Sequence, residues 1–348
     1  MTIASAAGLA GIVIDSPCGG KGTCGKCKVL VISQNSDPPT ESEERLLSIE
    51  EISKGYRLAC QTIITHDMIV NVPQDSRIRA IKTLSEGTGQ EIKLHRNISK
   101  TYIEIQEQTL DNQISDFTNI KKALNRPDLR ADLRIMRELP NVLRKAKFKV
   151  TLVLDGNKLI GIEPGDTTKK NYGLAIDIGT TTVVCTVVDL NTGHEKAVAS
   201  ALNAQATHGA DVVSRINYTV ENEKGLDELG NRIMQVINQI SEYACAEAHV
   251  DLNNVYEVTI VGNTTMTHLF LKIPVRNLAI LPYVGVVSDP VESTASELGF
   301  NVNPNANIYV LPNIAGFVGA DTVGVILASA LNRSDKIKLA IDIGTNGE

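Results

Sequence analysis

The chain has 348 residues, of which 43% are hydrophobic and 21% are charged, which is typical of a globular protein with two or three domains. A net charge of −6, the absence of Trp and an aromatic content of 4% argue against a nucleic-acid partner. No apolar run is long enough to span a bilayer and no secretory leader pattern occurs, so we expect a cytoplasmic protein without a membrane partner.

Residues 1–73 are expected to form one domain around a cysteine-rich loop. Residues 2–14 are expected to form a short alanine-rich helix that runs into an extended entry to the loop, and a strand follows the loop over 28–32. A charged helix is predicted over 41–52, and a strand over 68–73 closes the domain.

The loop itself carries three cysteines among four glycines. Cys18, Cys24 and Cys27 follow the spacing C-x5-C-x2-C, and an isolated Cys60 comes later. Four thiolates arranged in this way can ligate the two irons of a [2Fe–2S] cluster. The glycines allow the backbone to wrap closely around an inorganic core and to direct amide groups at anionic sulfurs. The loop therefore predicts electron transfer.

Two other uses of these cysteines are less consistent with the sequence. A structural zinc site usually shows two paired knuckles, whereas only Cys24 and Cys27 form a CxxC pair and Cys60 has no His at ligand spacing. A disulfide framework suits a small secreted chain better than a long chain with six cysteines. The remaining Cys185 and Cys245 lie among apolar residues and are expected to be buried small hydrophobic residues.

The next two regions show no catalytic constellation. Residues 74–98 are polar, mixed in charge and without a sustained period, which predicts a linker that lets the first domain move or, equally, a surface loop packed on the next domain. Residues 99–170 carry a strand, an amphipathic helix over 114–124 and a hairpin that turns at Gly156, which predicts a small α+β middle domain. Its expected role is that of a spacer or of a contact between the two copies of a homodimer.

A second informative stretch joins a buried strand to a turn rich in hydroxyl groups. Asp177 stands near the end of an apolar strand, and the turn Gly179-Thr180-Thr181-Thr182 leads into the next strand. Hydroxyls and amides of such a turn can hold phosphate oxygens, and a carboxylate at a strand end can hold Mg²⁺ through water. The stretch lacks the pattern of a Walker loop, so it predicts another kind of nucleotide site.

The same strand and turn recur near the end of the chain, where Asp342, Gly344 and Thr345 repeat the order of the first motif. The elements predicted between the copies are strands over 183–190, 197–202, 258–262 and 308–311 and helices over 210–248, 264–271 and 315–331. This order indicates duplication of a ribonuclease-H-like unit. Residues 171–336 are expected to form its first lobe, and residues 337–348 to begin the second.

The two turn motifs resemble the phosphate motifs of the superfamily of sugar kinases, heat-shock ATPases and actin. Together with the ferredoxin-type loop, they make the whole chain similar to the reductive activators of corrinoid proteins, as do the stretches 15–20, 262–268 and 311–316. The resemblance implies an α+β and α/β multidomain fold, with a β-grasp ferredoxin-like domain, a small middle domain and a ribonuclease-H-like lobe.

The resemblance also implies an activity, cofactors and partners. The expected activity is an ATP-dependent electron transfer that returns an inactive Co(II) corrinoid, on a methyltransferase partner protein, to Co(I). The expected cofactors are a [2Fe–2S] cluster and ATP with Mg²⁺, and a low-potential electron donor is the second partner. The family pattern further implies that the opening hairpin of the first domain and the rest of the second lobe lie outside the chain, so we expect a fragment truncated at both ends.

Two other functions fit the same motifs. A nucleotide-regulated, ferredoxin-type electron carrier would serve another low-potential acceptor and would deliver electrons without a corrinoid protein. A phosphotransferase similar to sugar kinases would carry a structural or sensory cluster and would form a phosphorylated product.

No residue is assigned a catalytic role from the sequence. His208 and His268 could be catalytic or face a corrinoid, but neither has a metal partner at helical spacing, so helix capping or packing is expected. Asp211 and Asp321 each open a helix after a glycine-rich turn and could act as general bases near a γ-phosphate. A carboxylate at a helix N-terminus is also stabilising in its own right.

Overall fold

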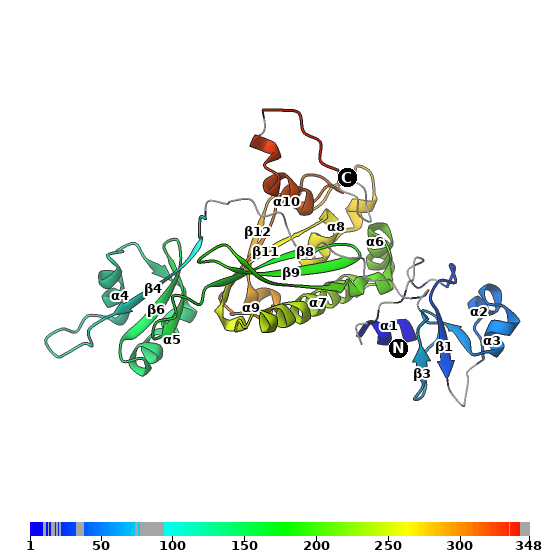
Figure 1. Cartoon of the computed structure of the whole chain (residues 1–348), viewed down its shortest axis with the longest axis horizontal. Coiled ribbons are helices and arrows are strands. Elements are labelled where there is room, and N and C mark those ends of the chain that lie inside the picture. The colour runs from blue at the N-terminus through cyan, green and yellow to red at the C-terminus, as the bar shows by residue number, and fades with distance from the viewer. Residues whose placement is uncertain are drawn as a thin grey trace.

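The computed structural model describes residues 1–9, 12, 14, 18, 20, 22–32, 38–73, 76, 94–333 and 335–341. The described chain contains three sheets in three bodies (Figure 1). The third body along the sequence is a central lobe that lies between the other two, with the N-terminal domain at one end and the middle domain at the other. In the described part of the chain, no helix is both long and apolar enough to cross a membrane.

The N-terminal domain is built on a three-stranded antiparallel sheet in the order β2-β1-β3. Its elements are α1 (Ile3–Leu9), β1 (Lys28–Ile32), α2 (Glu41–Leu46), α3 (Ile49–Ser53), β2 (Tyr56–Leu58) and β3 (Ile69–Asn71). The single helix predicted over 41–52 is wrong, because the chain forms two short helices there. Ser48 interrupts the first helix and caps the second, since its side chain accepts a hydrogen bond from the Glu51 amide.

Glu43 is a buried carboxylate that ties the helices of this domain to the segment carrying the fourth cysteine. One oxygen, Oε2, accepts from the Thr40 amide at 2.8 Å and completes the capping box of α2. The other, Oε1, accepts from the Leu58 amide at 2.8 Å and from the Thr62 hydroxyl at 2.9 Å. Glu43 is only 1% exposed, so water does not reach its carboxylate, which is the acceptor that satisfies these three donors.

The middle domain is a four-stranded sheet in the order β4-β6-β7-β5, with two helices. Its elements are β4 (Ile98–Glu104), α4 (Asp116–Leu124), β5 (Arg130–Ala131), α5 (Leu133–Lys145), β6 (Lys149–Asp155) and β7 (Lys158–Pro164). The predicted hairpin is confirmed as β6 and β7, and Gly156 in its turn has a φ of 51°. The apolar face of α5 was not predicted, and Ile135, Leu139 and Leu143 from it are buried in the domain core.

A buried polar network joins the middle domain to the central lobe. The Lys100 side chain is fully buried and forms an ion pair with Glu163 at 2.8 Å. Tyr256, which belongs to the lobe, donates its hydroxyl hydrogen to the same carboxylate at 2.8 Å. This pairing satisfies a charge that would otherwise be costly to bury, and it attaches the two bodies to each other.

The central lobe contains a mixed six-stranded sheet in the order β10-β9-β8-β11-β13-β12. Strands β8, β11 and β13 are parallel, and the other three are antiparallel to their neighbours. The elements are β8 (Tyr172–Ile178), β9 (Thr182–Asp189), β10 (Glu195–Leu202), η2 (Ala204–His208), α6 (Val212–Glu221), α7 (Gly225–Glu247), β11 (Val255–Gly262), α8 (Thr264–Phe270), β12 (Val291–Thr294), α9 (Ala295–Leu298), β13 (Asn307–Val310) and α10 (Ala320–Ala328).

Two helix predictions for the lobe differ from the structure. The helix predicted over 210–248 is two helices, α6 and α7, because Asn222 leaves the helical region with φ of −124° and ψ of 120°. Gly225 then begins α7 close to the end of α6, where an added Cβ would lie 2.8 Å from the Tyr218 carbonyl oxygen. The helix predicted over 315–331 is limited to α10, and the short elements β12 and α9 were not predicted.

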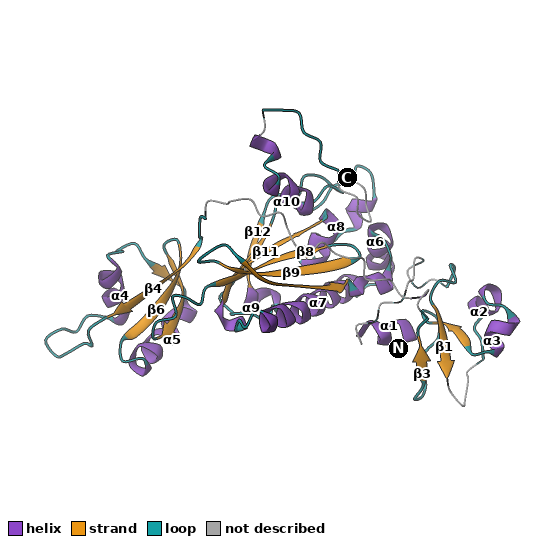
Figure 2. Cartoon of the chain, in the orientation of Figure 1, coloured by secondary structure: helices purple, strands orange, loops and turns teal. Residues whose placement is uncertain are grey.

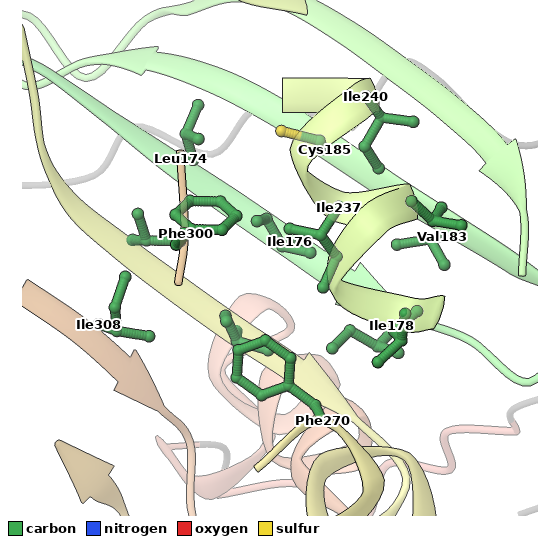
Figure 3. Close-up of a cluster of buried hydrophobic side chains, with 14 of the residues drawn as sticks. Leu174, Ile176, Ile178, Val183, Cys185, Ile237, Ile240, Phe270, Phe300 and Ile308 are labelled. Atoms are coloured by element: carbon green, nitrogen blue, oxygen red, sulfur yellow. The ribbon is translucent and has the colours of Figure 1, made fainter. Parts of the chain in front are cut away.

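The lobe core lies between the sheet and α7, which runs along β9 and β10 (Figure 2). Ile237 and Ile240 of α7 lie against the sheet, where Ile176 and Cys185 are fully or almost fully buried (Figure 3). Burying one such aliphatic side chain contributes roughly 1.5–3 kcal/mol. The buried positions of Cys185 and of Cys245, at 0% and 1% exposure, agree with their assignment as small hydrophobic residues.

We predict that Glu43→Ala loosens the N-terminal domain. The change leaves the Leu58 and Thr40 amides without their acceptor, whereas the Thr62 hydroxyl keeps the Leu58 carbonyl oxygen, and it costs about 3 kcal/mol of local stability. Hydrogen exchange followed by mass spectrometry should therefore be faster in peptides covering 41–62. Glu44→Ala on the same helix is the matched control because Glu44 is exposed, and equal exchange in the two variants would contradict the prediction.

Candidate cluster and nucleotide sites

The four cysteines of the predicted cluster site form two pairs of free thiols. The sulfur atoms of Cys18 and Cys24 lie 3.4 Å apart, and those of Cys27 and Cys60 lie 3.2 Å apart. Both separations are far longer than a disulfide bond of about 2.0 Å. Among the described residues, no three His, Cys, Asp or Glu side chains surround a single point. Two pairs of thiols suit two irons better than one tetrahedral zinc ion.

Strand pairing brings the distant Cys60 to the loop. Cys27 directly precedes β1 and Cys60 closely follows β2, and these strands pair antiparallel with Lys28 opposite Leu58. The Ala59 amide then donates to the Cys27 carbonyl oxygen at 2.9 Å and extends the pairing to the ligand positions. The sheet therefore determines how closely these two sulfurs approach.

Gln61 supports the loop from the same side, although the sequence did not single it out. Its Nε2 donates to the Gly20 carbonyl oxygen at 2.6 Å and lies 3.6 Å from the Cys60 sulfur. Gly22 has a φ of +66°, and an added Cβ there would lie 2.8 Å from the Gln61 side chain. The positive φ therefore favours glycine, and any other residue would also have to displace the ends of the Gln61 and Ser42 side chains. Adjacency to Cys60 is the one sequence signal that could have identified Gln61.

Within each pair, one thiol has a lowered pKa and the other a raised pKa. Burial raises the pKa of Cys18, but hydrogen bonds from Thr23 and Cys24 outweigh it and lower the pKa to about 6. The hydrogen bond from Cys27 lowers the pKa of Cys60 to about 7. That bond and burial raise the pKa of Cys27, and burial raises the pKa of Cys24. Each pair therefore offers one thiolate near neutral pH, and binding a metal would release the second proton.

The predicted nucleotide residues lie at the carboxyl end of β8, in the parallel part of the sheet. Asp177 is exposed near that end, and β11 ends beside it at Gly262. Helix α8 follows β11, and α10 follows β13. Open parallel sheets bind ligands outside the carboxyl ends of their strands, so this edge is the expected place for a phosphate group.

The turn between β8 and β9 is tight and is attached to α8. An added Cβ at Gly179 would lie 2.5 Å from the Thr182 carbonyl oxygen, so no other residue fits this backbone. The Thr180 hydroxyl accepts a hydrogen bond from Asn263 Nδ2 at 3.0 Å. Asn263 also caps α8, since its Oδ1 accepts from the Met266 amide at 3.0 Å. The turn and the start of α8 therefore form one unit.

Three consecutive carbonyl oxygens of this turn are held from its inner side. Asn203 donates to Gly179 through Nδ2 at 2.9 Å and to Thr181 through its backbone amide at 2.8 Å. The Arg215 guanidinium donates to the Thr180 carbonyl oxygen between them. Neither Asn203 nor Arg215 was predicted, because their roles depend on contacts across the fold rather than on a local motif.

Of the other candidate residues, His268 and Asp211 lie in the described part of the chain, and the second turn motif does not. The packing role expected for His268 agrees with its contacts, because its Nδ1 faces the Thr264 carbonyl oxygen at 2.7 Å and its Nε2 accepts from the Val286 amide at 3.1 Å. Asp211 caps α6 by accepting from the Ser214 amide at 2.8 Å. The second turn motif, with Asp342, Gly344 and Thr345, lies outside the described residues.

Three family models match successive parts of the chain. A 2Fe-2S iron-sulfur cluster binding domain matches residues 1–65, a RACo linker region matches 87–169, and a RACo middle region matches 172–334. Together these matches span most of the chain.

Individual relatives agree with the family models. The corrinoid activation enzyme RamQ of Eubacterium limosum is 30% identical over 341 residues, which is 97% of this chain and 54% of that protein. One component of the Na(+)-translocating NADH-quinone reductase of Chlamydia caviae is 44% identical over 64 residues, or 18% of this chain and 15% of that component. The chain thus spans about half the length of the relative that it matches throughout.

A solved structure is similar over the whole chain. It is a reductive activator for corrinoid, iron-sulfur protein, with 36% sequence identity and a TM-score of 0.68, and the match covers 100% of this chain and 58% of that one. The predicted fold class is confirmed: the chain is a mixed α+β multidomain protein with a ferredoxin-type domain and the fold of an actin-like ATPase lobe.

We predict a distinct order of cysteine reactivity in protein prepared without iron. Thiolates rather than thiols react with iodoacetamide, so labelling of Cys18 should rise with pH around 6 and labelling of Cys60 around 7. Burial raises the pKa of Cys185 to about 11 and of Cys245 to about 12, and both should stay unlabelled in the folded protein. Peptide mass spectrometry across pH 5–9 measures these rates, and labelling of Cys24 ahead of Cys18 would contradict the assignment.

Proposed function

We propose that this chain, which belongs to the family of reductive activators of corrinoid proteins, passes electrons through a [2Fe–2S] cluster in an ATP-dependent reaction that returns Co(II) corrinoid to Co(I). The observation that carries the proposal is the presence, in one chain, of two thiol pairs and of a rigid hydroxyl-rich turn at the carboxyl edge of a parallel sheet. The relatives, named as an activation enzyme and as a reductive activator, support it.

The four cysteines would hold the cluster with one pair on each iron. Cys18 and Cys24 would bind the first iron, and Cys27 and Cys60 the second, in agreement with the two sulfur separations. The cluster supplies one electron at a time when it is bound. Gln61 would keep the loop closed on the cluster through its bond to the Gly20 carbonyl oxygen.

The turn between β8 and β9 would bind ATP with Mg²⁺. Asp177, exposed near the end of its strand, would hold the ion through water. Backbone and hydroxyl groups of residues 179–182 would bind phosphate oxygens. Asp342, Gly344 and Thr345 would belong to the second phosphate motif, which faces the first in a two-lobed clamp.

Coupling to ATP gives the reaction its direction. Reduction of Co(II) corrinoid to Co(I) is uphill for ordinary donors, so a favourable step must accompany it. Binding or hydrolysis of ATP between two lobes can provide that step by shifting the population of two arrangements of the protein. The acceptor would be the corrinoid protein of a methyltransferase system, and the donor a low-potential electron carrier.

Each of the three bodies would have its own role. Residues 1–73 would carry the cluster, and residues 74–98 would link them to the middle domain. Residues 99–170 would act as a spacer or dimer contact. Residues 171–336 would bind the nucleotide together with the lobe that begins at 337.

We predict that Cys60→Ala abolishes or alters the cluster signal. Anaerobically purified protein should show visible charge-transfer bands that bleach with dithionite and a spin-half EPR signal after reduction. Cys245→Ala is the matched control, since that cysteine lies in the core of the central lobe, and it should keep both signals. A colourless wild-type protein that holds zinc after iron–sulfur reconstitution would exclude the electron-transfer function.

We predict that Asp177→Asn weakens binding of MgATP by about tenfold, which corresponds to roughly 1.4 kcal/mol. The rate of Co(II) corrinoid reduction at limiting ATP should fall with it, as followed by visible absorption. Glu247→Gln, at the exposed end of α7, should leave both unchanged. The protein for this test includes any sequence that continues beyond the printed chain. Reduction that proceeds equally well without ATP would favour a ferredoxin-type carrier, and a phosphorylated product would favour a phosphotransferase.

A further inference from the structure

The segment 203–209, which consists of Asn203, the short helix η2 and Gly209, lies between the phosphate-binding turn and the N-terminal domain. On its inner side, Asn203 holds two carbonyl oxygens of the turn. On its outer side, η2 contacts α1 of the N-terminal domain. One short segment therefore touches both functional parts of the chain.

Arg215 attaches this segment to the turn. Its Nε donates to the Gly209 carbonyl oxygen at 3.0 Å and its Nη1 to Gln205 Oε1 at 3.2 Å, both within the segment. Its Nη2 donates to the Thr180 carbonyl oxygen in the turn. Its Nη1 also contacts Met266 Sδ of α8 at 3.0 Å. The guanidinium thus bridges the segment and the turn, and its planar fork is suited to hold several acceptors in a fixed geometry.

The charge of Arg215 suggests what completes this arrangement. The side chain is fully buried, and burial lowers the pKa of its guanidinium, which the Asp211 carboxylate offsets only in part. In the described part of the chain, no carboxylate forms an ion pair with it. A buried charge is costly unless an opposite charge lies near it. An anionic phosphate on the outer side of the turn would supply that charge, so binding of an anion there and the charged state of Arg215 would favour each other.

The rest of the segment is firmly packed. The side chains of Gln205 and Thr207 are buried, and Gln205 Nε2 donates to the Leu229 carbonyl oxygen at the start of α7 at 3.0 Å. An added Cβ at Gly209 would lie 2.7 Å from Ser214 Cβ, so this glycine allows the segment to lie directly against α6. A displacement of the turn would therefore move the whole segment, because its tight packing leaves no room for an internal rearrangement to absorb the shift.

The outer side of the segment contacts the cluster-bearing domain closely. A methyl group added to Gly8 of α1 would lie 3.3 Å from Thr207 Cγ2. Beside this contact, a cavity of about 350 Å³ is lined by Cys18 and Thr23 from the cluster loop and by His208 and residues of α6 from the lobe. His208 packs on the ring of Tyr218 at a centroid distance of 4.3 Å.

We infer that Arg215 and the segment 203–209 are positioning residues. They transmit the binding of a nucleotide at the phosphate turn to the contact between η2 and α1 of the cluster-bearing domain. The inference rests on the proposed function and adds the route of coupling to it. Hydrogen bonds to three consecutive carbonyl oxygens link the turn to the segment, and the contact between Thr207 and Gly8 links the segment to α1. The surroundings of the cluster loop should therefore respond when a nucleotide binds.

The test uses cluster-loaded protein, including any sequence beyond the printed chain, with a non-hydrolysable ATP analogue and Mg²⁺. Calorimetry measures binding of the analogue, and EPR of the reduced cluster together with hydrogen exchange of α1 measures the response. In the wild type, the analogue should change the EPR line shape and slow exchange in α1. Gly8→Leu should force α1 off Thr207, so the affinity should stay within twofold while both responses are lost.

Matched variants separate this route from a general loss of structure. Gly8→Ala adds only a methyl group, so it should keep the response. Arg215→Met should lose the response of the cluster, and Arg215→Lys, which keeps the charge but not the fork, should restore part of it. If Arg215→Met fails to fold, the two Gly8 variants decide the question on their own.

The outcomes distinguish this inference from the proposed function. The coupling route is wrong if the analogue binds but changes neither the wild-type EPR signal nor the exchange of α1. It is also wrong if Gly8→Leu responds like the wild type. In both cases the proposed function stands. If the wild type binds no nucleotide, the proposed function fails and the inference fails with it.

Discussion

The hydrogen bonds that Asn203 and Arg215 donate to residues 179–181 are the constraint that fixes the turn of the candidate nucleotide site. The carbonyl oxygens of residues 179–181 accept hydrogen bonds from outside the turn, which fixes the backbone of the turn. Asn203, after β10, and Arg215, in α6, provide the donors. Because the same residues form or hold the surface that contacts α1, the candidate nucleotide turn and the N-terminal domain share one support.

The two thiol pairs stand in different surroundings, although one loop contributes to both. Cys27 is almost fully buried and is placed by the pairing of β1 with β2, which also brings Cys60 into reach. Cys18 lines a cavity that the cluster loop shares with the central lobe. One half of the candidate cluster site is therefore part of the domain core, and the other half faces the body that would bind the nucleotide.

Local patterns predicted the elements whose stability is local. The hairpin of β6 and β7 follows from alternating residues around Gly156, and β1 follows from its apolar run, because short-range geometry decides both. The helices over 41–52 and 210–248 were predicted as continuous because helix propensity alone does not show where a helix is interrupted. A second capping box at Ser48 and the close packing of Gly225 on α6 interrupt them. Short elements such as β12 are stabilised by their sheet neighbour and carry no signal of their own.

The sequence by itself determined which chemistry is proposed. Cysteine spacing, glycines that permit a tight loop, and an Asp followed by a Gly-Thr turn depend on residue type and short distances along the chain, so they indicated the cluster and the nucleotide site directly. Only the tertiary structure decided which thiols pair, that Gln61 contacts the loop, and that the buried Arg215 joins the turn to the segment 203–209. These features depend on contacts between residues far apart in the chain, and no local pattern encodes them.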